Sequence, residues 1–234
     1  MQPTRAFRCS RPWIAPDSAL LTKQGPGKSV QEGNFQAQED TNRPSGCHHP
    51  PGWRPFLILS FTGSRMTFQK MKSGVLLITG TPGTGKSTIA KSLGKKIRAL
   101  VVNEKSFCQK EKCATFDPKT KEWEIDLKKY KTAFTRYAKQ HSNKTIILEG
   151  HVACEVNLPV SKIIVLTCGP VELGYRLAMR HYSELKIQEN MYCEATNYCT
   201  EQVQKHYRGK KVLKVDTSAH SPTQTTQKIQ KWLK

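Results

Sequence analysis

The residues best suited to chemistry lie in one short stretch, residues 75–88, which read Val-Leu-Leu-Ile-Thr-Gly-Thr-Pro-Gly-Thr-Gly-Lys-Ser-Thr. An apolar run here enters a glycine-rich turn that ends in Gly-Lys-Ser, the order of a phosphate-binding P-loop. Gly80, Gly83 and Gly85 permit backbone angles that a side chain would forbid, so successive N–H groups can point at bound phosphates. The stretch predicts a site for a nucleoside triphosphate.

The side chains at the end of this loop predict how phosphates and a metal ion would be held. Lys86 would reach the β and γ oxygens, and Ser87 or Thr88 would offer a hydroxyl to Mg²⁺. A helix continuing over Ile89–Ile97 would add its positive N-terminal end. The alternative is a chance match in a glycine-containing loop, but the preceding apolar strand and the following helical pattern are the context that the motif requires.

A second motif follows another apolar strand, Thr145–Glu149. Its carboxylate, Glu149, is predicted to hold Mg²⁺ directly or through water, as a Walker B acid does. His151 is a candidate to orient water or an acceptor phosphate. The alternative for a lone histidine is a surface or hydrogen-bonded residue.

Two arginines, Arg176 and Arg180, are four residues apart and would share one face of a helix. A mobile cationic pair can close over a transferring phosphoryl group and exclude water. The alternative is a solvated basic helix end, which the helix dipole favours.

Three motifs together resemble the atypical adenylate kinases of archaea and the eukaryotic nucleus, across roughly residues 74–234. They are Ile78–Thr88, Glu149-Gly150-His151 and Arg180–Asn190. The resemblance implies transfer of the ATP γ-phosphate to AMP, with Mg²⁺ as cofactor and Arg180 in a short lid touching the ATP phosphates. Relatives often have Asp where Glu149 stands, which leaves direct coordination of the metal open.

The resemblance also implies a role in assembling the small ribosomal subunit, as an ATPase that engages pre-ribosomal RNA and a small-subunit ribosomal protein. A formal net charge of +20 favours a polyanionic partner such as RNA. Residues 1–65 hold 8 of the 38 basic and 4 of the 18 acidic side chains, which leaves +16 on the remainder. Nucleotide substrates alone also recruit lysine and arginine, so both explanations of the charge stay open.

The elements that must position these residues alternate between apolar strands and helical segments from Ser73 onward, the pattern of a doubly wound α/β sheet. Strands are predicted at 75–79, 99–102, 145–149, 162–167 and 211–215, and helices at 86–97, 127–141, 171–181, 184–207 and 222–233. Ligands of such sheets gather at the carboxyl ends of the strands. We therefore predict a P-loop NTPase with a five-stranded parallel sheet of the nucleoside-monophosphate-kinase type.

The chain divides by composition into two parts. Residues 1–70 are rich in Pro, Gly, Ser, Gln and Asn, and are predicted to be disordered or a non-native extension. Residues 71–234 form the predicted P-loop domain, with a short NMP-binding insertion at about 103–126 and a lid at about 179–189.

The resemblance places AMP in the first of these insertions. Asn103 at a strand end, and Phe107 or Trp123 as a surface for stacking the base, are candidates. Each is equally explained as a turn residue or part of the local core. The loop Asp216–Ala219 lies where kinases of this architecture hold adenine with backbone groups.

The cysteines and the hydropathy indicate the compartment. An ATP-dependent chain without an opening signal peptide favours reduced thiols for its eight cysteines. Neither Cys108 with Cys113 nor Cys193 with Cys199 has the C-x-x-C spacing of a zinc knuckle, and zinc is a minor alternative. No apolar run approaches the roughly 18 residues of a membrane span, so no membrane contact is expected. The expected location is cytoplasmic, or nuclear in a eukaryote.

Two other functions compete with an adenylate kinase, which itself could accept several nucleoside monophosphates. One is primarily an ATP-driven ribosome-assembly factor, and the other is a different small-metabolite P-loop kinase. The chain after Glu149 lacks the Gly-Gly-Gly turn of shikimate kinases, the Asp-Arg of thymidylate kinases and the Gly-Phe-Pro-Arg of ordinary adenylate kinases. Their absence favours the atypical group.

Overall fold

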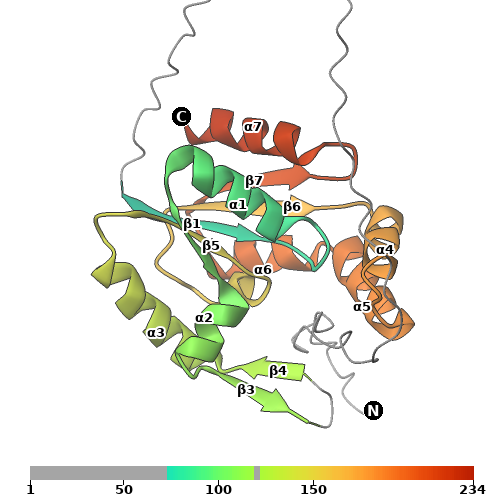
Figure 1. Cartoon of the computed structure of the whole chain (residues 1–234), viewed down its shortest axis with the longest axis horizontal. Helices are drawn as coiled ribbons and strands as arrows, with labels where there is room; N and C mark the ends of the chain where they lie inside the picture. The colour runs from blue at the N-terminus through green and yellow to red at the C-terminus, as the bar shows by residue number, and fades with distance from the viewer. Residues whose placement is uncertain (1–72, 119–121) are drawn as a thin grey trace, which may run out of the picture. The chain divides into compact units, whose positions relative to one another are not determined.

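The computed structural model describes residues 73–118 and 122–234. Residues 1–70, for which disorder or a non-native extension was predicted, lie outside the described residues. Five parallel strands form the central sheet in the order β2-β5-β1-β6-β7 (Figure 1). Their bounds are β1 Gly74–Thr79, β2 Leu100–Asn103, β5 Thr145–Glu149, β6 Lys162–Thr167 and β7 Lys211–Asp216. The predicted fold class and all five predicted strands are therefore confirmed.

The helices alternate with the strands along the chain. They are α1 Lys86–Ile97, α2 Glu104–Lys110, α3 Leu127–Gln140, the 3-10 helix η1 Val152–Glu155, α4 Pro170–Ala178, α5 Glu184–Ala195, α6 Tyr198–His206 and α7 Pro222–Leu233. The single helix predicted over 184–207 is wrong. Asn197 adopts φ 53°, in the left-handed region, and this residue separates α5 from α6.

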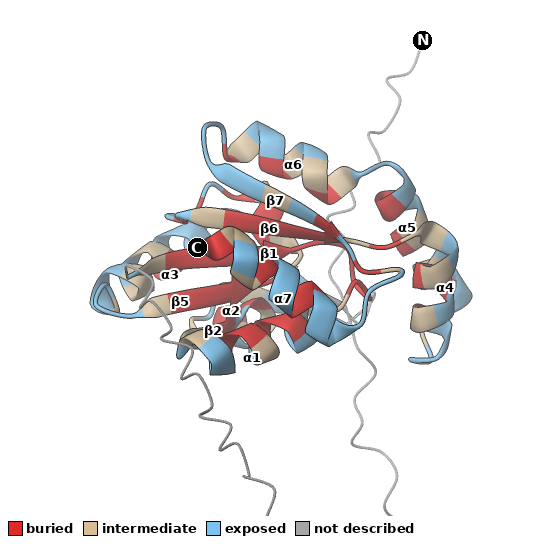
Figure 2. Cartoon of the chain, turned by 90° about the horizontal axis from the view of Figure 1, so that it is seen from above, coloured by how far each residue is buried: buried red, intermediate tan, exposed pale blue. Residues whose placement is uncertain are grey.

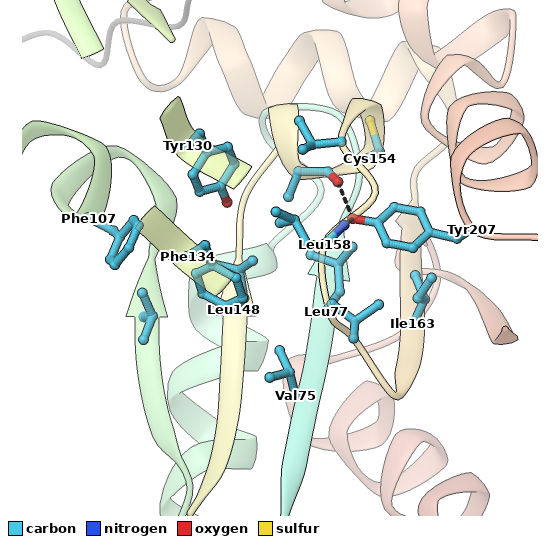
Figure 3. Packing of buried hydrophobic residues seen from close by; sticks show 14 of the residues in the cluster. Val75, Leu77, Phe107, Tyr130, Phe134, Leu148, Cys154, Leu158, Ile163 and Tyr207 are labelled. Atoms are coloured by element: carbon cyan, nitrogen blue, oxygen red, sulfur yellow. Dashed lines mark hydrogen bonds between the residues drawn. The ribbon is translucent and has the colours of Figure 1, made fainter. Parts of the chain in front are cut away.

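Helices cover both faces of the sheet (Figures 1 and 2). On one face, α1 and α7 bury Ile89, Leu93 and Ile229 against the strands. On the other face lie η1, α2, α3 and α6. Their buried side chains include Phe107, Phe134, Cys154, Val203 and Tyr207, and Figure 3 shows part of this packing. Buried apolar surface on both faces explains why the strands read as nearly continuous apolar runs.

The parallel register brings the carboxyl ends of β1, β2 and β5 together. β1 lies between β5 and β6, with Ile78 opposite Glu149 and Thr79 opposite Val165. β2 pairs with the other edge of β5, with Asn103 opposite Glu149. The loop after β1, the acid that ends β5 and the residue that ends β2 therefore emerge side by side.

Two insertions interrupt the alternating pattern. Between β2 and α3 the chain forms α2 and an antiparallel hairpin, β3 Ala114–Asp117 with β4 Glu122–Ile125, neither of which was predicted. Asp126 caps α3 by accepting hydrogen bonds from two backbone N–H groups, as its type predicts. A five-residue connection joins α4 to α5. Among the described helices, none is long and apolar enough to cross a membrane.

Candidate functional site

The loop after β1 has the backbone conformation that its glycines predict. Gly80, Gly83 and Gly85 have φ of 145°, 94° and 92°, where L side chains are strained. A Cβ on Gly80 would also lie 2.2 Å from the carbonyl oxygen of Leu166. Helix α1 begins directly after Gly85, so its first N–H groups face the space in front of the loop and favour an anion there.

Lys86 curls back over the loop. Its ammonium donates to the carbonyl oxygens of Gly80 at 2.8 Å and Thr81 at 3.0 Å. Desolvation lowers the pKa of Lys86, although Cys199, Glu149 and Glu104 favour its charged form. A phosphate could replace these two carbonyl oxygens as partners of the ammonium.

A hydroxyl and a carboxylate from different elements meet beside this lysine. The Ser87 hydroxyl, at the start of α1, donates to both carboxylate oxygens of Glu149 at 3.1 Å. The Asn103 amide donates to the same carboxylate. Hydroxyl and carboxylate oxygens are the hard donors that Mg²⁺ prefers, so the pair fits that ion. Thr88 is exposed one residue further along α1.

His151 is tied to the loop rather than free. Its ring Nδ1 lies 3.2 Å from the Gly80 carbonyl oxygen and 3.4 Å from the Cys199 sulfur. Its backbone N–H donates to the carboxylate of Glu104 at 2.9 Å. Burial opposes a charge on the ring, but the hydrogen-bonded Cys199 sulfur and the Glu104 carboxylate favour the charged form, so the pKa of His151 is raised.

Most of the predicted site residues line one cavity. It opens in front of the P-loop and continues to the β3–β4 hairpin, so it has a polar end and an apolar end. Its polar lining includes Lys86, Ser87, Asn103, Glu149, His151 and Arg180, together with Gly83, Gly85 and Thr88. Its apolar lining includes Ala114, Trp123 and Ile125. The cavity can thus accept a charged group at one end and a flat apolar group at the other.

The two arginines of the predicted mobile pair have different surroundings. Arg180 lies beyond the end of α4, is exposed and lines the cavity. Arg176 donates to the carboxylate of Glu172 at 2.8 Å and to the backbone oxygen of Thr217 at 2.8 Å. The prediction that both arginines form a mobile pair is therefore wrong for Arg176, because hydrogen bonds hold it to the β7 end.

The two aromatic candidates for stacking are also separated. Phe107 is buried and packs against Phe134 and Tyr137, with ring centroids 5.6 and 5.3 Å away. Its interpretation as a base-stacking surface is wrong, since the ring belongs to the core. Trp123 lines the cavity and pairs across the hairpin with Phe116.

Two buried carboxylates near the loop were missed from the sequence. Glu104 accepts hydrogen bonds from the N–H groups of His151 and Val152, and Glu194 accepts from the Thr81 hydroxyl. Burial raises the pKa of both acids. Glu104 follows a strand, the same signal that marked Glu149, whereas nothing in the helical pattern of α5 distinguishes Glu194.

No zinc centre appears in the part of the chain that the structure describes: no three His, Cys, Asp or Glu side chains gather there as metal ligands. In that part, Cys108, Cys113, Cys154, Cys168 and Cys199 are free thiols. The sheet and the loop together define a P-loop NTPase fold of the nucleoside-monophosphate-kinase type.

Comparison with known proteins gives the family. A family model described as an AAA domain matches residues 76–197. A protein of Pyrococcus abyssi is 33% identical over 156 residues, covering 66% of this chain and 81% of that protein. One of Methanosarcina barkeri is 32% identical over 155 residues, covering 66% and 82%. Both carry the name "Putative adenylate kinase". The chain belongs to this family, the atypical adenylate kinases.

Solved structures resemble the chain more distantly. A shikimate kinase from Bacteroides thetaiotaomicron is 16% identical with a TM-score of 0.46, covering 68% of this chain and 98% of that chain. Nothing about the substrate follows from a likeness of this degree.

Proposed function

We propose that this chain is an adenylate kinase that transfers the γ-phosphate of ATP to AMP and gives two molecules of ADP. The observation that carries the proposal is the continuity of one cavity between the P-loop and the β3–β4 hairpin. A phosphate donor at the polar end and a nucleotide acceptor at the hairpin end would meet within it. Family membership supports the same reaction.

The P-loop supplies the donor site. The backbone N–H groups around Gly83 and Gly85 and the start of α1 would hold the phosphates, and Lys86 would exchange its two carbonyl partners for β and γ oxygens. Catalysis would then come from positioning the donor and acceptor phosphates and from neutralising the negative charge that develops on the transferred phosphoryl group. An acceptor phosphate is already anionic, so no general base is needed.

Ser87 and Glu149 would hold Mg²⁺, directly or through water, with the Thr88 hydroxyl as the alternative to Ser87. The bound ion would neutralise negative charge shared between the β and γ oxygens. Asn103 would keep the Glu149 carboxylate in place.

Arg180 would close over the phosphates as part of a lid at residues 179–189. Its side chain is exposed at the cavity wall, so it can reach a ligand without breaking a buried contact. His151 would act closer to the transferred group, by fixing the Gly80 carbonyl and by offering its ring to an acceptor phosphate. We assign both as catalytic residues of the proposed reaction.

The acceptor would occupy the insertion at residues 103–126. The Trp123 ring, beside the apolar side chains of Ala114 and Ile125, offers a face on which a purine could stack. Such stacking alone tolerates every base, so a kinase of broader nucleoside monophosphate specificity is the nearest alternative to one specific for AMP.

A coupled assay of ADP formation from ATP and Mg²⁺ tests the proposal. AMP, CMP, UMP and GMP are supplied one at a time, beside a reaction with no acceptor. The proposal expects a rate with AMP far above the rate without acceptor. Equal rates in all five reactions would overturn the proposal in favour of an ATPase. A rate that rises only with CMP, UMP or GMP would show that the acceptor is that monophosphate and not AMP.

The second candidate is an ATP-driven ribosome-assembly factor that engages small-subunit ribosomal RNA and a small-subunit ribosomal protein. The net charge of +20 favours this candidate over other classes of binding protein. Its test is ATP hydrolysis without AMP, measured with and without small-subunit ribosomal RNA. Stimulation by RNA supports it, and an unchanged rate counts against it. A small-metabolite kinase is the third candidate and has no specific support here.

A further inference from the structure

Three segments of the chain carry positive charge without any negative charge. Residues 87–103, 202–215 and 217–234 together contain twelve lysines and arginines and no aspartate or glutamate. The fourteen acidic side chains that follow residue 72 all lie in the other segments of the sequence. A strong local positive field would result if the three segments meet in the fold.

The fold brings the ends of these segments together. Helices α1 and α7 both begin beyond the carboxyl ends of strands and run side by side to the other end of the sheet (Figure 1). The Thr226 hydroxyl of α7 donates to the Ser92 hydroxyl of α1 at 3.3 Å, which fixes their relative position. At the start of β6, the Lys162 ammonium donates to the Leu233 carbonyl oxygen at 3.1 Å. Lys162 also pairs with Lys211, the first residue of β7, and α6 leads into β7.

We call this surface, at the amino ends of β6 and β7, the basic end. It carries nine exposed cations, which are Lys95, Lys96 and Arg98 at the end of α1, Lys205, Arg208, Lys210 and Lys211 between α6 and β7, and Lys231 and Lys234 at the end of α7. Within residues 73–118 and 122–234, none of the nine takes part in an ion pair. Glu201 and Asp216, the acids that flank the middle segment, lie in the first turn of α6 and at the carboxyl end of β7. The basic end therefore has no neutralising carboxylate among the described residues.

The helix dipole accounts for only part of this charge. Cations are favoured in the last turn of a helix, where four of the nine lie. Arg208, Lys210 and Lys211 lie outside the described helices, so the dipole gives no reason for their positions. Clustered like charges repel one another and oppose the compact state. A polyanion bound at the basic end would remove that repulsion.

The side chains around these cations favour one kind of polyanion. A surface that binds lipid headgroups adds apolar side chains that insert into the bilayer. Of the eight large apolar side chains that are exposed in the described part of the chain, only Val212 lies in the three segments. Helices α1, α6 and α7 meet the basic end with their carboxyl ends, so none of them lies along it as a helix that enters the major groove of DNA would. A flexible single strand of nucleic acid, whose phosphates can follow an uneven row of cations, fits best.

We propose that the basic end is a binding surface for single-stranded nucleic acid, which it holds through the phosphate backbone without reading the sequence. It lies at the end of the sheet opposite the P-loop, so a bound strand leaves the cavity open to nucleotides. The proposal does not depend on the proposed phosphotransfer, because none of the nine cations lines the cavity.

The first test measures binding of a fluorescent oligouridine RNA to the full chain by anisotropy at several salt concentrations. The expected dissociation constant at physiological salt is on the order of 10⁻⁴–10⁻⁶ M. The logarithm of the binding constant should fall with the logarithm of the salt concentration with a slope of about −3, since each neutralised phosphate of a single strand contributes about −0.7. A DNA strand of the same length should bind equally well, because the basic end holds phosphates. Absence of RNA binding, or binding only to vesicles of anionic lipid, would overturn the proposal.

Charge reversal at the basic end tests the position of the site. A variant that combines Arg208→Glu, Lys210→Glu and Lys231→Glu should bind the RNA about tenfold or more weakly, with a shallower salt slope. The matched control reverses three exposed lysines at the start of α3, with the changes Lys128→Glu, Lys129→Glu and Lys131→Glu. It changes the net charge by the same amount and should bind within about twofold of the unmutated chain. Equal losses in both variants would show that only net charge matters, which contradicts a site at the basic end.

Ultraviolet crosslinking of the RNA to the unmutated chain, followed by peptide mapping, gives a readout that does not depend on whether a variant folds. Crosslinks within residues 95–98, 205–211 or 231–234 would support the site, and crosslinks confined to residues 1–72 or to the cavity would overturn it. RNA binding by Lys86→Ala should equal that of the unmutated chain, whereas its loss would place the RNA at the P-loop. A chain that binds RNA in this way but shows no transfer to AMP would contradict only the proposed function.

Discussion

The carboxylate of Glu194 accepts a hydrogen bond of 2.5 Å from the hydroxyl of Thr81, a contact that joins α5 to the P-loop across 113 positions of sequence. The other carboxylate oxygen accepts from the backbone N–H of Cys168 at 2.8 Å. Glu194 is 9% exposed and Thr81 is fully buried. Helix α5, which begins within the proposed lid, is thus hydrogen-bonded through Glu194 to the loop that would bind phosphate.

Replacing Thr81 with valine tests this connection. Thr81→Val keeps the shape of the side chain but leaves a buried carboxylate oxygen without its donor, so we expect a loss of about 1–3 kcal/mol in the free energy of unfolding. ATP affinity, measured by calorimetry, should fall as well, because Thr81 lies within the loop.

Thr226→Val is the control for this change, since its buried hydroxyl donates to the Pro222 carbonyl oxygen within α7 and contacts the Ser92 hydroxyl in α1, and neither residue lines the cavity. It should lower stability without changing ATP affinity. Normal ATP affinity in Thr81→Val would show that the contact serves only the fold.

Replacing Arg180 should mainly lower activity, whereas replacing Arg176 should mainly lower stability. Arg180→Ala removes an exposed cation from the cavity wall, and we expect kcat to fall by about 100-fold or more with little change in melting temperature. Arg176→Ala breaks contacts with Glu172 and Thr217, so it should cost about 1 kcal/mol of stability with a smaller kinetic effect. Steady-state kinetics and thermal melting of both variants check the contrast, and the reverse pattern would make Arg180 structural.

Trp123 and Phe107 form a second contrasting pair. Trp123→Ala should raise KM for the acceptor, by about 5-fold or more if stacking contributes on the order of 1–3 kcal/mol, and leave KM for ATP nearly unchanged. Phe107→Ala should instead destabilise the core by about 3–5 kcal/mol. Initial rates at varied acceptor and urea unfolding measure the two effects. An unchanged acceptor KM in Trp123→Ala would remove Trp123 from the acceptor site.

Glu104 gives a prediction about pH. Burial raises its pKa in the folded protein above the ordinary value of 4.5, so the folded state binds more protons than the unfolded state between the two pKa values. Its contribution to stability is therefore greatest below pH 4.5 and is lost as the pH rises through the folded pKa.

Glu104→Gln retains an oxygen for the N–H groups of His151 and Val152 but cannot ionise. We expect it to flatten the fall in unfolding free energy above about pH 4.5, as measured by urea titration at several pH values. Glu124→Gln, an exposed substitution on the hairpin, is the control. Identical slopes in the wild type and Glu104→Gln would contradict the buried, proton-binding state of this acid.

The sequence predicted those parts of the fold that local patterns encode. The strands are apolar runs buried on both faces, and the P-loop glycines adopt φ values at which L side chains are strained. The break between α5 and α6 was missed because it depends on Asn197 in a left-handed conformation within an otherwise helical pattern.

The sequence predicted those site residues whose role follows from a motif within one strand or loop. It did not predict those whose role depends on tertiary contacts. Phe107 and Trp123 are both aromatic residues of the same insertion, and only packing against α3 places Phe107 in the core. Arg176 likewise resembles Arg180 in the sequence, and its contacts with Glu172 and Thr217 are what distinguish it from Arg180. Glu194 meets Thr81 across a sequence separation that no local pattern reveals.

The most direct test of the proposed phosphotransfer follows the label from ATP that carries ³²P in its γ-phosphate. With Mg²⁺ and AMP, the account predicts that the label appears in ADP rather than in inorganic phosphate. The rate should be at least about 100-fold lower in Lys86→Ala and nearly unchanged in Lys95→Ala, an exposed lysine of the same helix. Label found only in inorganic phosphate, at the same rate with and without AMP, would contradict the account.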